Sequence, residues 1–105
     1  MAETERMRQI RALLEDDPHD PFLLYGLAME HVSAGDDATA AEAFRELLIA
    51  SPQYVPTYLM LAQTLVRLGR EGEAKEVLRV GVGVAGHERD PHAQGELQAM
   101  LDSLE

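Results

Sequence analysis

A period of 34 residues runs through this 105-residue chain and limits what it can fold into. Seven residues return unchanged one period later: Leu27, Ala28, Val32, Gly35, Ala40, Glu42 and Arg45 recur as Leu61, Ala62, Val66, Gly69, Ala74, Glu76 and Arg79. The offset also runs backward, since Leu13, Leu14 and Pro18 anticipate Leu47, Leu48 and Pro52. A fixed period of this length is typical of arrays in which one supersecondary unit stacks on its neighbours, because a single unit cannot bury its apolar face alone.

The apolar residues inside each unit follow the period of an α-helix in two separate stripes. In the first unit, one stripe comprises Leu24, Leu27, Ala28 and His31, and the other comprises Ala40, Phe44, Leu47 and Leu48. Spacings of three and four residues put each set on one face of a helix. The sequence therefore predicts an all-α, helix-turn-helix repeat solenoid of about six helices. These helices are expected near residues 3–15, 21–34, 37–50, 55–68, 71–85 and 91–104.

The predicted helix ends carry residues that favour starts and stops. The pairs Asp20–Pro21 and Asp90–Pro91 each place a side-chain acceptor before a proline that is already set at a helical φ. Gly35 and Gly69 stand where a helix commonly ends in a left-handed residue. These signals support the boundaries that the apolar stripes predict.

The length of the chain predicts a single domain over residues 1–105. Its parts would be an N-terminal half-repeat helix (1–18), two full repeats (21–54 and 55–88) and a C-terminal capping helix (90–105). The last helix departs from the period, because Gly95 and Glu96 would replace Leu61 and Ala62. We therefore expect it to cover the exposed end of the stack with its polar face outward.

The formal charge of −10 is unevenly spread, because nine acidic residues lie between Glu15 and Glu46 against Arg45 alone. Such a surface repels a phosphate backbone, which argues against nucleic acid as a partner. The acidic face stays open to three readings: a solvated surface, an adaptation to a high-salt cytoplasm, or a functional surface. The chain has no cysteine, no apolar run near the ~20 residues that span a bilayer and no apolar leader, so we expect a cytoplasmic protein without a membrane partner.

The repeats resemble the tetratricopeptide repeat (TPR) family over about residues 6–86. In that family a small residue on the first helix meets a small residue on the second, and a large apolar residue and a hairpin glycine follow. The matching residues here are Ala28 with Ala40, Ala62 with Ala74, Phe44 and Leu78, Gly35 and Gly69, and the closing Pro18 and Pro52. The two units differ at Leu24 and Tyr58, and at Leu47 and Gly81, and Gly86 replaces the last closing proline.

The resemblance implies a protein- or peptide-binding adaptor with a concave groove lined by the first helix of each unit. By register, the groove would be lined by Phe22, Tyr25, Met29, Val32, Pro56, Leu59, Gln63 and Val66. One branch of the family clamps a C-terminal carboxylate with Lys and Asn, but the matching places here hold Tyr25, Met29 and Met60. The implied partner is therefore an apolar segment or helix of another protein.

Motifs that would indicate chemistry lack their structural context. The run Gly81–Gly86 matches G-x-G-x-x-G, but a dinucleotide loop follows a strand, whereas residues 71–80 predict a helix. The glycines instead predict a soft end for that helix. Segment 87–92 holds two histidines and an aspartate without a metal-ligand pair on one helix face, and His31 is expected to be a satisfied histidine of the packing face. We predict no enzyme, no cofactor and no metal site.

The alternative to an adaptor is a structural or self-association module. In that case the apolar groove or the ends of the stack would pair with another copy and form a homo-oligomer. Both functions depend on an uncovered apolar surface, so the sequence alone leaves both open.

Overall fold

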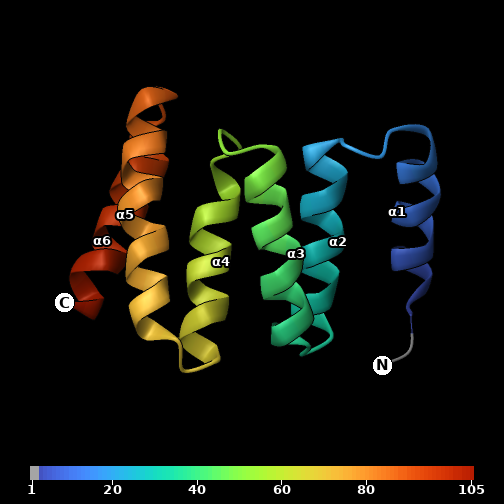
Figure 1. Cartoon of the computed structure of the whole chain (residues 1–105), viewed down its shortest axis with the longest axis horizontal. Helices are drawn as coiled ribbons and strands as arrows, with labels where there is room; N and C mark the ends of the chain where they lie inside the picture. The colour runs from blue at the N-terminus through green and yellow to red at the C-terminus, as the bar shows by residue number, and fades with distance from the viewer. Residues whose placement is uncertain (1–2) are drawn as a thin grey trace.

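The computed structural model describes residues 3–105 and confirms the expected all-α class. Six helices follow one another (Figure 1): α1 (Glu5–Asp16), α2 (Pro21–Ser33), α3 (Asp37–Ala50), α4 (Pro56–Arg67), α5 (Glu71–His87) and α6 (Pro91–Leu104). Met1 and Ala2, which belong to the predicted half-repeat 1–18, lie outside the described residues. Across the described chain, no helix combines the length and apolar character that crossing a membrane requires.

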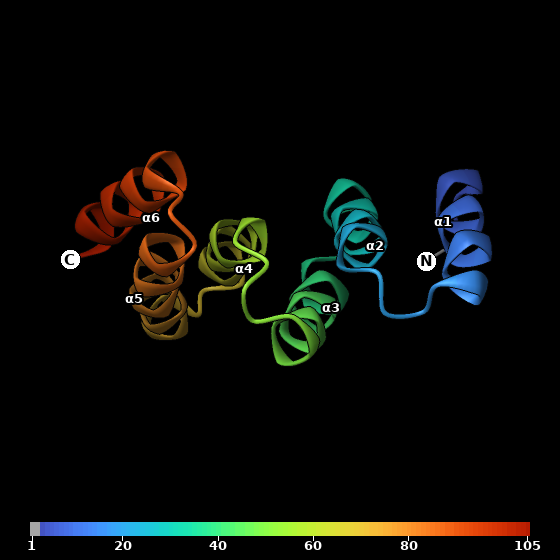
Figure 2. The same ribbon diagram turned by 90° about the horizontal axis from the view of Figure 1, so that it is seen from above.

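The helices stand side by side in a row, with the two termini at opposite ends (Figure 1). Seen from above, α2, α4 and α6 form one layer, and α3 and α5 form the other (Figure 2). Each helix packs on its neighbours in sequence, and α6 also reaches back onto α4. In the same view α4 lies closer to the layer of α3 and α5 than α2 and α6 do, so the layer that these three helices form is concave at its middle.

The expected capping residues hold the helix ends. The Asp20, Asp36 and Asp90 carboxylates accept hydrogen bonds from backbone N–H groups in the first turns of α2, α3 and α6. Gly35 and Gly69 adopt φ values of 77° and 76°, the left-handed conformation that the hairpin turns require. The helix boundaries that the sequence predicts therefore differ from the observed ones by only about one or two residues.

Part of the acidic stretch has a structural role. Hydrogen bonds from Thr39 lower the pKa of the Asp36 carboxyl at the start of α3. The neighbouring Asp37 carboxylate accepts three hydrogen bonds of 3.1 to 3.2 Å from the Arg67 guanidinium, which belongs to the next repeat. These two acidic residues are therefore used in capping a helix and in joining adjacent repeats.

The expected soft end of α5 is instead regular helix. α5 continues through Gly83 and Gly86 to His87, two residues beyond the predicted end at residue 85. Ala85 is fully buried, and the Gln94 side chain of α6 donates a hydrogen bond of 3.2 Å to the Val82 carbonyl oxygen. Packing against α6 therefore outweighs the low helix propensity of the glycines.

The small residues at which the family resemblance implies close helix crossings are buried in both units. Ala28 and Ala40 in the first unit, and Ala62 and Ala74 in the second, are fully buried in one continuous core. A side chain larger than alanine at these places would force the helix axes apart. The close crossings align the apolar stripes so that the fully buried Phe44 and Leu78 fill the space beside them.

A matched exchange of residue size explains one difference between the units. A Cβ atom added at Gly81 would lie 2.7 Å from the Tyr58 Cβ atom, so the Tyr58 side chain packs directly against the Gly81 backbone of α5. The Tyr58 hydroxyl donates a hydrogen bond of 2.5 Å to the Pro52 carbonyl oxygen, and burial raises the pKa of that hydroxyl. The first unit has two leucines, Leu24 and Leu47, at the equivalent places. The second unit instead combines a large residue, Tyr58, with the smallest one, Gly81.

α6 covers the end of the stack, and its buried residues repeat the buried pattern of α4 at a different offset. Its buried residues Leu97 and Leu101 lie 36 positions after the fully buried Leu61 and Leu65 of α4. The period of 34 residues therefore ends before α6, as expected, and an offset of 36 residues relates α6 to α4. α6 occupies the layer of α2 and α4 (Figure 2) and acts as the first helix of an incomplete third unit.

We expect Ala40→Leu and Ala74→Leu each to lower the free energy of unfolding by about 1–3 kcal/mol through overpacking of the helix crossing. Chemical denaturation measures this loss. Ala38→Leu is the matched control, because Ala38 is exposed on the same helix as Ala40. Equal denaturation midpoints for the Ala38 and Ala40 variants would contradict the close crossing.

Two glycines of α5 should respond to alanine with opposite signs. Gly83 has open space where a Cβ atom would lie, so Gly83→Ala should raise stability by up to about 1 kcal/mol through better helix propensity. At Gly81 the clash with Tyr58 outweighs that gain, so Gly81→Ala should lower stability by about 1–2 kcal/mol. Thermal and chemical unfolding of the two variants measure both effects, and changes of the same sign would show that α5 moves away from α4 at little energetic cost.

Candidate functional site

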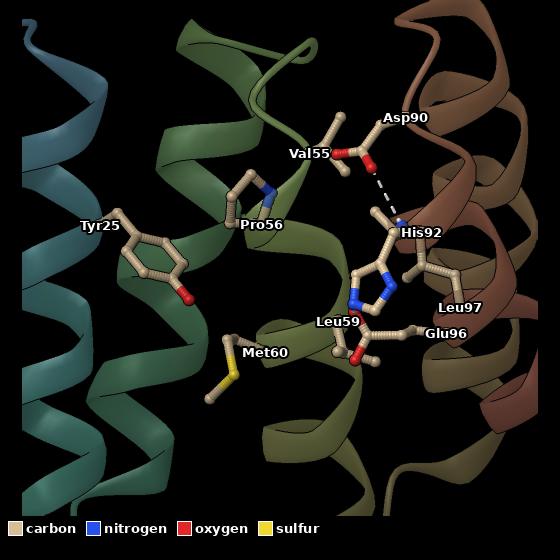
Figure 3. Close-up of a pocket in the computed structure, with 10 residues that line it drawn as sticks. Tyr25, Val55, Pro56, Leu59, Met60, Asp90, His92, Glu96 and Leu97 are labelled. Carbon is tan, nitrogen blue, oxygen red and sulfur yellow. Dashed lines mark hydrogen bonds and ion pairs between the residues drawn. The ribbon is translucent and has the colours of Figure 1, made fainter.

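The concave face contains a hollow of about 270 Å³ between α2, α4 and α6. Figure 3 shows Tyr25 on one side, Leu59 and Met60 in the middle, and His92 and Glu96 on the other side. Three successive first helices therefore contribute to one cavity. The lining residues are Tyr25, Val55, Pro56, Leu59, Met60, Asp90, His92, Ala93, Glu96 and Leu97.

The floor of the hollow is an apolar side of α4 that is only partly buried against the core. The buried side of α4 carries Tyr58, Leu61 and Leu65, which pack into the core. Pro56 is exposed, and Leu59 and Met60 are half-buried where α4 faces the hollow. Because helical residues three and four positions apart share a face, these three side chains form one continuous apolar surface.

Tyr25 forms an ordered wall at the α2 side. Its ring centroid lies 5.9 Å from that of Phe44 and 5.8 Å from that of Tyr54, with tilts of 54° and 56°. These are favourable geometries for aromatic pairs, and they restrict the Tyr25 ring. Burial, and to a smaller extent the neighbouring Tyr54, raise the pKa of the Tyr25 hydroxyl, so it is a neutral hydrogen-bonding group at physiological pH.

The α6 side of the hollow is polar and acidic. The Asp90 carboxylate accepts a hydrogen bond of 3.1 Å from the Ala93 backbone N–H, which begins α6. One turn into the helix, the Glu96 Oε1 atom lies 3.3 Å from the His92 Nε2 atom, an ion pair only when the imidazole is protonated. No lysine or arginine lines the cavity.

The structure brings three of the predicted groove residues together. Tyr25, Pro56 and Leu59 line the hollow. Phe22 is on the same layer but is 70% exposed and lies outside the cavity lining. The remaining four predicted residues are half-buried and also lie outside the lining: Met29, Val32, Gln63 and Val66.

Sequence reasoning missed the contribution of α6. The prediction treated this helix as a cap, whereas Asp90, His92 and Glu96 form one wall of the hollow. A signal was present, because the Asp-Pro pair at 90–91 repeats the pair at 20–21, which begins a first helix. That repetition assigns α6 to the same class of helix as α2.

The other candidate groups do not assemble into a reactive centre. His31 is half-buried, but its Nδ1 atom is buried without a hydrogen-bond partner, so the expectation of a satisfied histidine was wrong. His87 ends α5 while His92 belongs to α6, and the described residues contain no group of three potential metal ligands. The run Gly81–Gly86 lies inside α5, which is not the strand-to-helix turn of a dinucleotide site.

A sequence model of the tetratricopeptide repeat matches residues 31–101. The chain belongs to the tetratricopeptide repeat family. The solution structure of a TPR domain protein from Salinibacter ruber is 36% identical, with a TM-score of 0.81 and coverage of 85% of this chain and 90% of that chain. No curated protein matches the chain.

Two more distant structures share the TPR fold of this chain. A protein from Bordetella parapertussis is 22% identical, with a TM-score of 0.82 and coverage of 97% of this chain and 89% of that chain. SycD, a type III secretion translocator chaperone from Yersinia enterocolitica, is 17% identical, with a TM-score of 0.83 and coverage of 93% and 75%. The TPR architecture is consistent with a protein-binding scaffold, and the family is typically non-catalytic.

Removal of α6 should damage both the core and the site of this TPR protein. Truncation after His87 removes the buried Leu97 and Leu101 and uncovers the apolar surface of α4 and α5 on which they pack. We expect a lower melting temperature and self-association of the truncated chain. Circular dichroism melting and light scattering measure these effects, and a truncated chain that stays monomeric and equally stable would contradict the assigned role of α6.

Proposed function

We propose that this TPR protein is a non-enzymatic adaptor that holds an apolar segment of a partner protein in the concave hollow. The observation that carries the proposal is a partly exposed apolar floor in the hollow, formed by the exposed Pro56 and the half-buried Leu59 and Met60. Apolar side chains that meet in a concave hollow can receive an apolar side chain of a partner segment.

The shape of the hollow favours a protein segment over a small molecule. Its volume of about 270 Å³ is at the lower limit of ligand cavities, which measure roughly 300–1,000 Å³. It lies between α2, α4 and α6, the helices of the concave layer (Figure 2), where a helix or extended peptide could insert a side chain. Such a site accepts one or two large apolar side chains, which supports a modest affinity.

The restricted wall and the apolar floor suit this use. The Tyr25 ring is already held by Phe44 and Tyr54, so little of its conformational entropy remains to be lost on binding. Met60 is unbranched and adapts to different apolar side chains. No lysine lines the hollow, which argues against recognition of a C-terminal carboxylate.

Tyr25→Ala and Leu59→Ala should each weaken binding of a partner peptide by about 1–2 kcal/mol, since buried aromatic and aliphatic anchors dominate interfaces. The helical content should stay near that of the wild type. Amide chemical-shift mapping with a candidate peptide, followed by titration of the variants, measures both. Ile49→Ala is the control, because Ile49 is 84% exposed on α3 and does not line the hollow.

Shift changes clustered on the acidic outer faces around Asp36, Asp37 and Glu42, with none at Tyr25 or Leu59, would contradict the proposal. The charged surface would then be the binding site. Unchanged affinity of Leu59→Ala would contradict it equally, because Leu59 lies in the middle of the floor.

A second candidate function is self-association, and the exposure of Phe22 favours it. Phe22 is 70% exposed and occupies the place in α2 that Pro56, which lines the hollow, occupies in α4. In a two-fold dimer each Phe22 could enter the other copy's hollow. Sedimentation equilibrium at several concentrations separates the two functions. A dimer of the wild type that is lost in Phe22→Ala supports self-association.

A further inference from the structure

The rim of the hollow carries negative charge that the chain itself leaves largely unbalanced. Asp90 and Glu96 both line the cavity from the α6 side. Across residues 3–105, neither carboxylate forms an ion pair with a lysine or arginine. Arg89 precedes Asp90 in the sequence but forms no ion pair with either carboxylate, and His92, whose side chain is 88% exposed, pairs with Glu96 only when protonated.

We infer that the apolar segment bound in the hollow carries a lysine or arginine that lies against Asp90 and Glu96. This inference rests on the proposed function and names the chemistry of its partner. It requires an apolar side chain on the α4 floor and a cationic group at the α6 rim, within the span of one short peptide. The apolar floor and the acidic rim meet where Ala93 and Leu97 of α6 border the cavity.

The energetics of burial favour a cationic over a neutral occupant. A purely apolar segment would exclude water from the two carboxylates and return no hydrogen bond or opposite charge to them. A lysine or arginine lays its aliphatic stem along apolar surface and extends its charged group to the rim. Arginine can in addition donate two hydrogen bonds to one carboxylate.

The charge of the chain also argues against a second copy as the occupant. The formal charge is −10, so two copies repel each other at long range. The exposed Phe22 follows the acidic Asp20 closely, and the exposed Leu13 precedes Glu15 and Asp16. Insertion of either side chain would bring further negative charge to a rim that is already acidic.

Glu96 is the residue on which the inference can be tested cleanly. Asp90 caps α6, so its replacement would disturb the helix as well as the charge. Glu96 is exposed, and its one charged neighbour is His92. Glu42→Gln is the matched control, because Glu42 is exposed on α3 and does not line the hollow.

The probe is a displayed library of random twelve-residue peptides, selected at low salt on the full-length chain. We expect the enriched peptides to combine apolar residues with lysine or arginine. In the best of them, replacing the basic residue by glutamine should weaken binding up to about fivefold, the upper end for a partly exposed ion pair. Glu96→Gln should remove most of this difference, whereas Glu42→Gln should retain it.

The outcomes separate the charge inference from the proposed function. The charge inference would be overturned, and the apolar site retained, by enriched peptides that lose affinity for Leu59→Ala but show no preference for a basic residue. Peptides that keep that preference with Glu96→Gln would have the same meaning. Peptides that bind Leu59→Ala as well as the wild type, or a selection that enriches none, would overturn both. Competition of the peptides by the protein's own concentration-dependent dimer would identify a second copy as the occupant and also overturn the inference.

Discussion

The close crossing of paired helices at small residues is the interaction on which the rest of this structure depends. The small residues of the two helices in each unit, Ala28 and Ala40 in the first and Ala62 and Ala74 in the second, are all fully buried. Because these side chains are small, the two helices of a unit approach until the larger residues beside them interlock. Gly81 extends the same principle to the contact between α4 and α5, where the Tyr58 side chain leaves no space for a Cβ atom.

Much of the fold could be predicted from the sequence because its determinants are local or repeated. The period of 34 residues identified the units, and Asp20, Gly35 and Gly69 marked the helix ends by their own hydrogen bonding and backbone preferences. The register of α6 could not be predicted in this way. The offset between α4 and α6 is 36 residues instead of 34, and only the packed structure shows that Leu97 takes the place of Leu61.

The candidate site was predictable to a smaller extent for the same reason. Tyr25, Pro56 and Leu59 belong to the two regular units, so their place on one face followed from the period. The acidic rim belongs to α6, whose register the period does not give. Phe22 was predicted in the groove but lies outside the cavity lining, because a position on the correct face does not establish that a side chain points into a cavity.

Tyr25 connects the concave face to the stability of the repeat array. Its ring is on α2, and it contacts Phe44 of α3 and Tyr54, which lies in the loop between α3 and α4 at the end of the first unit. In a linear array the stability of the whole depends strongly on the coupling between neighbouring units. A ligand held between Tyr25 and the α4 floor would bridge that junction and, by mass action, favour the state in which both units are folded. Occupancy of the hollow would thereby make unfolding of this short solenoid more cooperative.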